Sequence, residues 1–201
     1  MHASIKRITG SALLVLLLLG ISGIPAHAQF GVAAGLNFES ADDIQLGDGS
    51  EATFENATGY HVGIVYDAGT GPLKVRPGLF YREVGDYDIL NNQVEIDRLE
   101  VPVDVKLTLP VQAVKPYLLG GPMVVFPQVG DDFGDDFRDV AYSVNVGVGV
   151  TIPLGQGATL QPEVRYEYGI NEYVEDDGDL FGDAEDSPRF QGFALRLHAT
   201  F

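Results

Sequence analysis

The chain contains no cysteine. It therefore has no disulfides, no thiolate metal sites and no cysteine to carry the lipid of a bacterial lipoprotein. Histidine is also scarce, and only His61 and His198 follow residue 28. Two histidines are too few for most metal or triad chemistry, and neither Ser143 nor Ser187 lies in the Gly-x-Ser-x-Gly motif of a serine nucleophile. We predict no enzymatic activity, no cofactor and no metal centre.

Basic residues are few as well. Twelve Lys and Arg stand against 29 Asp and Glu, which gives a formal charge of −17. Nucleic-acid binding needs clustered Lys and Arg, so this balance argues against it. The balance also argues against a basic patch that docks on anionic lipid. No apolar run of helix-spanning length follows residue 28, so the remaining chain could cross a membrane only as a barrel.

Residues 1–28 resemble a cleaved signal peptide. Lys6 and Arg7 precede an apolar run over residues 12–21, and Ala26-His27-Ala28 fits the motif for cleavage before Gln29. A retained transmembrane helix is the alternative, but the run is shorter than the roughly 20 residues that a span needs. We predict a signal peptide over 1–28 and one domain over 29–201. Cleavage removes two basic residues and no acidic one, so the charge becomes −19.

Apolar and polar residues alternate along the predicted domain. The period of two is clear at the end of the chain, where Phe193, Leu195 and Leu197 oppose Arg196 and His198. This period predicts β-strands with one apolar face. In the fifth segment nearly every residue is apolar, so its facing stays open. The eight predicted strands lie within residues 29–38, 60–66, 73–82, 98–109, 115–126, 142–152, 160–170 and 189–201.

Short and long connections alternate between these segments. The connections over 67–72, 110–114 and 153–157 read as tight turns rich in Gly and Pro. Long acidic loops are predicted over residues 39–57, 127–139 and 172–188, with a shorter one over 86–93. This alternation is typical of bacterial outer-membrane barrels with both termini in the periplasm. We predict an all-β fold: an eight-stranded, antiparallel, up-and-down transmembrane β-barrel in the outer membrane.

A soluble secreted barrel of the lipocalin type is an alternative, and it would bind a hydrophobic ligand. It would place the apolar face inside and the charged face in water. The mixed polar face, with many small residues between charges of both signs, suits a crowded lumen better. Tyrosines near the segment ends favour a membrane barrel because they could form interfacial girdles. These tyrosines are Tyr60, Tyr66, Tyr81, Tyr142, Tyr166 and Tyr168.

Charged residues on the polar faces are predicted to meet inside the barrel. An eight-stranded barrel has an interior that side chains fill, and an unpaired buried charge costs several kcal/mol. We therefore expect a lumenal charge network that acts as a structural plug. The alternative is a narrow pore or channel for small solutes or ions. The expected network consists of Arg76, Arg98, Glu100, Asp104, Lys106, Glu163, Arg165, Glu167 and Arg196.

The acidic loops contain two Phe-Gly-Asp cores, at residues 133–135 and 181–183. Carboxylates clustered around a Gly turn can hold Ca²⁺, which takes six to eight oxygen ligands. Neither loop has the ligand spacing of an EF-hand, so a solvated acidic surface, or bridging through divalent cations to lipopolysaccharide phosphates, is an alternative. The candidate cation-binding residues are Asp131, Asp132, Asp135, Asp136, Asp176, Asp177, Asp179 and Asp183.

Two segments carry a family resemblance. Leu99-Glu100-Val101-Pro102 followed by Lys115-Pro116-Tyr117-Leu118-Leu119-Gly120-Gly121-Pro122 resembles the paired signature of PorT-like outer-membrane β-barrel domains. The resemblance implies a small bacterial outer-membrane barrel and gives no catalytic residues. The strand that ends at Phe201 resembles the signal read by the barrel-assembly machinery. We expect a structural or interaction role at the cell envelope, with that machinery, outer-membrane lipid and lipopolysaccharide as partners.

Overall fold

The computed structural model describes residues 29–41, 44–45, 51–52, 57–89, 92–111, 114–129, 140–170 and 190–201. The predicted signal peptide and the eight candidate cation-binding residues lie outside these ranges. No helix in the described part of the chain is long and apolar enough to cross a membrane.

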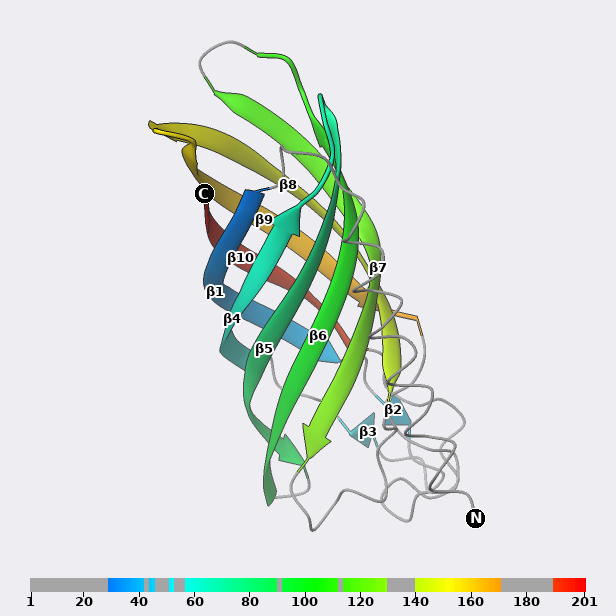
Figure 1. Ribbon diagram of the computed structural model, residues 1–201. Helices are drawn as coiled ribbons and strands as arrows, with labels where there is room; N and C mark the ends of the chain where they lie inside the picture. The colour runs from blue at the N-terminus through cyan, green and yellow to red at the C-terminus, as the bar shows by residue number, and fades with distance from the viewer. Residues whose placement is uncertain are drawn as a thin grey trace, which may run out of the picture.

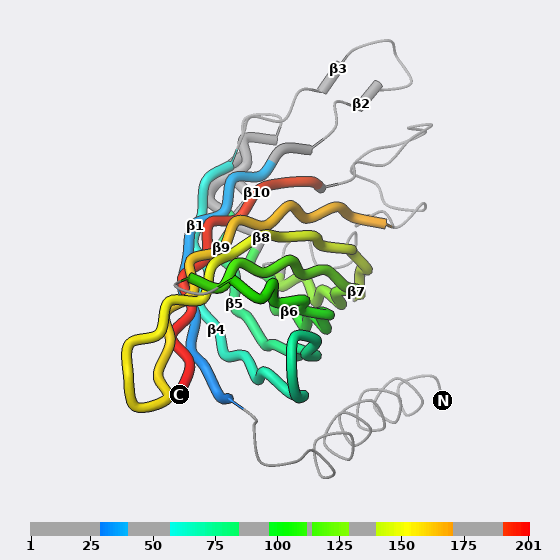
Figure 2. Tube along the Cα trace, turned by 90° about the horizontal axis from the view of Figure 1, so that it is seen from above, coloured from blue at the N-terminus to red at the C-terminus, as the bar shows by residue number. Residues whose placement is uncertain are grey.

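Eight strands form one closed barrel in which every neighbouring pair is antiparallel (Figures 1 and 2). The first and last barrel strands pair, with Gly31 opposite Thr200, and so close the wall. The predicted fold class is confirmed. The strands are β1 (Gln29–Ala41), β4 (Ala57–Asp67), β5 (Leu73–Ile89), β6 (Asn92–Thr108), β7 (Lys115–Val129), β8 (Ala141–Gly155), β9 (Ala158–Gly169) and β10 (Phe190–Thr200).

The two ends of the barrel differ. The turn end carries the β4–β5, β6–β7 and β8–β9 connections together with the start of β1 and the end of β10. The loop end carries the other four connections, and a small hairpin of β2 (Ile44–Gln45) and β3 (Glu51–Ala52) lies there (Figure 1). The prediction of a loop over 86–93 was wrong. β5 and β6 stay paired up to Ile89 opposite Asn92, because each strand satisfies the backbone of the other.

The reversal between β8 and β9 is tighter than predicted. Strand β8 continues to Gly155, which pairs with Ala158, so that only Gln156 and Gly157 form the turn. Both have positive φ, 51° and 88°. Two central residues with positive φ characterise the type I′ turn, whose twist matches that of the paired strands. Gln156 is the one non-glycine residue with positive φ in the described ranges.

The apolar faces of the strands point outward. Val146 is 60% exposed and Phe193 56% exposed, whereas Asn145 and Arg196, on the opposite faces of the same two strands, are buried. A lipocalin-type barrel would need the reverse arrangement, so that alternative was wrong about which face forms the interior. An apolar outer wall around a charged interior is the arrangement that lipid requires.

Strand β7 also has two distinct faces, which its sequence does not separate. Tyr117, Met123 and Val125 point into the barrel and are buried, while Leu118 is 49% exposed on the outside. Met123 and Val125 pack with Ala141 of β8 inside the barrel wall. The strand is apolar on both faces because part of the interior is itself apolar.

Glycines on the inner wall make room for rings from neighbouring strands. A Cβ atom at Gly149 would lie 2.3 Å from the phenol of Tyr117, and one at Gly63 would lie 2.4 Å from the ring of Phe80. By contrast, a Cβ at Gly147 would meet no side-chain atom closer than 3.3 Å. Bulky side chains thus lie against the wall where glycine leaves room for them.

Candidate functional site

The interior of the barrel is the site with the densest chemistry in the described part of the chain. Six basic and six acidic side chains are buried there, and none of these twelve residues is more than 7% exposed. With ionised side chains their formal charges cancel. The bases are Arg76, Arg82, Arg98, Lys106, Arg165 and Arg196, and the acids are Glu39, Asp67, Glu100, Asp104, Glu163 and Glu167.

All nine residues of the predicted network lie in this interior. Sequence reasoning missed Glu39 and Asp67, which it assigned to connections, and it left out Arg82. Glu39 continues the inward phase of β1, which includes Ala33 and Asn37, so the alternation itself could have located it. Asp67 continues the inward phase of β4 in the same way.

Near the turn end, Asp67 holds two cations. Arg76 donates to both carboxylate oxygens of Asp67, with Nη2 2.9 Å from Oδ2. Lys106 Nζ donates to Asp67 Oδ2 at 3.0 Å and to Gln161 Oε1 at 2.7 Å. The Lys106 ammonium also lies 4.3 Å from the ring centroid of Tyr117. Each donor of this lysine therefore faces an acceptor or a ring.

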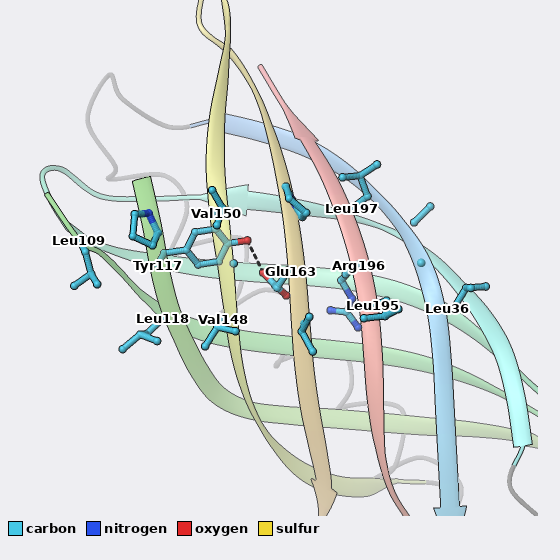
Figure 3. A pocket seen from close by; sticks show the side chains of 16 residues that line it. Leu36, Leu109, Tyr117, Leu118, Val148, Val150, Glu163, Leu195, Arg196 and Leu197 are labelled. Carbon is cyan, nitrogen blue, oxygen red and sulfur yellow. Dashed lines mark hydrogen bonds between the residues drawn. The ribbon is translucent and has the colours of Figure 1, made fainter. Parts of the chain in front are cut away.

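In the middle of the barrel, Glu163 and Arg165 form a second cluster. Arg165 Nη2 donates to Glu163 Oε1 at 2.8 Å and to Asp104 Oδ2 at 2.9 Å, and its Nη1 donates to Asn145 Oδ1 at 2.9 Å. The hydroxyl of Tyr117 donates to Glu163 Oε2 at 2.9 Å, and Figure 3 shows the two side chains pointing toward one another. These contacts fix the orientation of Arg165.

Toward the loop end, Arg82 joins three carboxylates. Its Nη1 donates to Glu39 Oε1 at 2.8 Å, its Nε lies 2.7 Å from Glu100 Oε1, and its Nη2 contacts Glu167. Arg98 contacts the other oxygen of Glu39. The guanidinium of Arg82 thus connects β1, β6 and β9 from its place on β5.

Some of these contacts cross the full width of the barrel. In the closed order of strands, β5 and β9 are four positions apart in either direction around the wall. Arg76 on β5 nevertheless reaches Glu163 on β9, with Nη1 3.3 Å from Oε2. Arg82 and Glu167 form a second ion pair between the same two strands. Side chains from opposite walls therefore meet at two levels along the barrel axis.

The two histidines also lie in this interior. His61 on β4 and His198 on β10 are on the two strands that flank β1. His61 Nε2 accepts a hydrogen bond from Arg196 Nε at 3.0 Å, and His198 Nε2 lies 3.5 Å from Glu163 Oε2. Ser143 is buried on β8, whereas Ser187 lies outside the described residues. The described ranges hold no cluster of three His, Cys, Asp or Glu placed to bind a metal ion.

A hollow of about 630 Å³ crosses β7, β8, β9, β10 and β1 (Figure 3). Its lining is mostly aliphatic and belongs to the outward faces of these strands, with Leu118, Val148 and Leu195 each 45–53% exposed. Glu163 and Arg196 border it but are buried. The hollow thus belongs to the apolar wall and offers no polar group for chemistry.

Comparisons with known proteins agree with this geometry. A family model described as "Outer membrane protein beta-barrel domain" matches residues 11–201. Neisserial surface protein A has a similar structure, with a TM-score of 0.51 at 16% identity over 86% of this chain and 97% of that one. The outer membrane enzyme PagL has a TM-score of 0.50 at 13% identity, over 85% of this chain and 97% of that one. The outer membrane protein OprG from Pseudomonas aeruginosa has a TM-score of 0.46 at 12% identity, over 87% of this chain and 96% of that one.

At these identities the structural likenesses concern the fold alone. No curated protein matches the sequence. The comparisons therefore support the barrel and its membrane, while the roles of individual residues rest on the geometry above.

Proposed function

The chain belongs to the outer membrane protein β-barrel domain family, and from that premise we propose that it is a non-enzymatic barrel with a closed lumen. Its role in this proposal is structural or interactional at the cell envelope, through the acidic loops. The observation that carries the proposal is the pair of ion pairs between opposite strands, Arg76 with Glu163 and Arg82 with Glu167. Where opposite walls touch, little space is left for a hydrated ion.

The energetics of the interior favour closure. Taking one partner from a buried ion pair costs about 3–5 kcal/mol, because the other charge is left uncompensated. A passing ion would have to separate several such pairs in sequence. Because six bases balance six acids, each of the twelve charges is compensated within the network, and none is left over to bind a solute ion.

A narrow pore is the second candidate, and one observation favours it. The charged groups form a column along the barrel, from Asp67 near the turn end to Glu39 near the loop end. Such a column could guide small ions if the pairs exchanged partners. Conductance across a planar bilayer separates the two candidates: a closed lumen gives no single-channel steps, whereas a pore gives them.

The proposal of a non-enzymatic role rests on the placement of the candidate groups. PagL shows that a barrel of similar fold can be an enzyme. In this chain His61 and His198 are fully buried and face Arg196 and Glu163, away from lipid and from water. A substrate could reach them only by entering the closed lumen. Substitution of both histidines by Gln should therefore change the stability of the barrel. It should leave any hydrolysis of envelope lipids unchanged.

We further propose that the acidic loops contact divalent cations and, through them, lipopolysaccharide. The support is the sequence: eight Asp residues in two loops on the side where a family barrel has its long connections. Replacing Asp131, Asp132, Asp135 and Asp136 by Asn tests this. The expected result is weaker calcium-dependent retention of lipopolysaccharide, and unchanged retention would rule the role out.

Three finer assignments complete the proposal: membership of the PorT-like group, both termini in the periplasm, and recognition of the last strand by the barrel-assembly machinery. The signature segments support the first, since they lie on neighbouring strands β6 and β7. The predicted export signal over residues 1–28, together with the position of the start of β1 and the end of β10 at the turn end, supports the second. For the third, deletion of Phe201, which is 66% exposed after β10, should lower the folded yield in cells while leaving refolding in detergent intact.

A further inference from the structure

Among the described residues, the positive charge outside the balanced interior lies at the turn end. Ten basic residues follow residue 28, and six of them belong to the balanced interior. Arg138 and Arg189 lie outside the described residues. The remaining two, Lys74 and Lys115, both line a cavity at the turn end, although the chain as a whole carries a charge of −17.

This cavity, the vestibule, is the open mouth of the barrel and has a volume of about 850 Å³. Lys74, Lys106 and Lys115 line it together with polar groups that include Gln29, Thr159 and Gln161. Asp67 is the one carboxylate among its lining residues. That carboxylate already binds Arg76 and Lys106, so it has little capacity left for a third cation.

Two lysines of the vestibule, Lys74 and Lys115, are poorly compensated. Lys74 and Lys106 lie directly opposite each other on β5 and β6, and like charges in that position destabilise a sheet. Lys74 Nζ donates to the neutral oxygen of Gln29 at 3.3 Å. Within the described ranges, neither Lys74 nor Lys115 forms an ion pair. An anion in the vestibule would relieve this surplus.

The rim beside these lysines is apolar. Leu73 at the start of β5 is 56% exposed, Val111 in the β6–β7 connection is 52% exposed, and Leu154 near the end of β8 is 62% exposed. A ligand that contacts both the vestibule lysines and the apolar rim needs an anionic head and a hydrocarbon tail. A phospholipid of the adjacent leaflet has both parts, with its tail against the rim and its phosphate over the lysines. Lysine binds phosphate as a compact point charge with three donors.

We propose that the vestibule binds the phosphate group of an anionic phospholipid from the leaflet at the turn end, with Lys74 and Lys115 as its ligands. The net charge of the chain argues against an anionic-lipid site. That net charge, however, includes the acidic residues of the loops at the other end of the barrel. The proposal depends on the membrane position of the family and not on whether the lumen conducts.

The test counts lipids retained by the full-length folded protein after extraction from nanodiscs of phosphatidylcholine with a minor share of phosphatidylglycerol. Native mass spectrometry gives the ratio of bound phosphatidylglycerol to bound phosphatidylcholine. Wild type should retain phosphatidylglycerol in excess of its share. Each of Lys74→Gln and Lys115→Gln should lower that excess about fivefold, the effect of one lysine near an anionic surface. The matched Lys74→Arg, Lys115→Arg variant keeps both charges and should retain the excess.

Heat-shifted electrophoretic mobility confirms that each variant is folded before lipids are counted. The proposal is overturned if wild type shows no preference for phosphatidylglycerol, or if the two Gln substitutions leave the preference unchanged. A further arm adds soluble glycerol phosphate. If it displaces the bound lipid, the vestibule recognises free phosphate esters and the lipid assignment is wrong; if it does not, the lipid assignment stands.

Discussion

Arg76 on β5 and Glu163 on β9 meet inside the barrel, with Nη1 3.3 Å from Oε2, although they come from opposite sides of the wall. The same carboxylate accepts hydrogen bonds from Tyr117 and Arg165. Glu163 therefore joins three strands around the barrel axis, β5, β7 and β9. This arrangement makes the interior part of the scaffold.

Arg82 should be the most sensitive interior cation, since three carboxylates depend on it. Arg82→Met should lower the free energy of unfolding by about 3–5 kcal/mol, because buried charges lose their partner. Urea titration of the barrel folded in lipid vesicles measures the change. Lys115→Met, at an exposed position, is the control and, in vesicles of phosphatidylcholine alone, should stay within about 0.5 kcal/mol of wild type. A loss below 1 kcal/mol for Arg82→Met would show that water reaches the network.

Two glycines on β8 should respond differently to the same substitution. Gly149→Ala places a methyl group against the phenol of Tyr117 and should cost about 1–3 kcal/mol, as overpacking does. Gly147→Ala would meet the Val164 carbonyl oxygen at 3.0 Å and the flexible Leu119 side chain at 3.3 Å, both less tight than the contact at Gly149, and should cost less. The same urea titration compares them. Tyr117→Ala should lessen the penalty at Gly149, and equal costs for both glycines would contradict the packing described.

A charge on the outer wall tests which solvent that wall faces. Val148 lies near the middle of β8 and is 53% exposed. Val148→Arg should destabilise the vesicle-folded barrel by about 2–4 kcal/mol, the cost of arginine near the bilayer midplane. Val148→Leu is the conservative control. If the arginine variant folds as stably as wild type, the wall does not face hydrocarbon.

The sequence predicts the barrel well because the solvent on each side of the wall imposes a period of two. Lipid requires apolar residues such as Val144 and Val146 on one face, and the crowded interior admits Asn145 or Gly147 on the other. Where both faces are apolar, as on β7, the period vanishes and the facing of Tyr117 could not be read.

The interior network could be predicted only in part. Its members on strand faces follow from alternation. Glu39 and Asp67 instead lie near strand ends, where Glu39 merges with a predicted acidic loop and Asp67 with a predicted turn rich in Gly and Pro. The charge count was a clue, since five bases and four acids cannot balance. Adding Glu39, Asp67 and Arg82 makes six of each. Which partners meet across the lumen depends on strand tilt and register, and a local sequence pattern predicts neither.

The most direct test of the closed lumen is the conductance of the purified barrel in a planar bilayer. We predict no single-channel steps for wild type. A variant with Arg76, Arg82, Glu163 and Glu167 all replaced by Ser keeps the charge balance and removes the two ion pairs between opposite walls. It should conduct, which shows that the assay detects an open lumen. Stepwise conductance of the wild-type barrel would contradict the account and establish the pore.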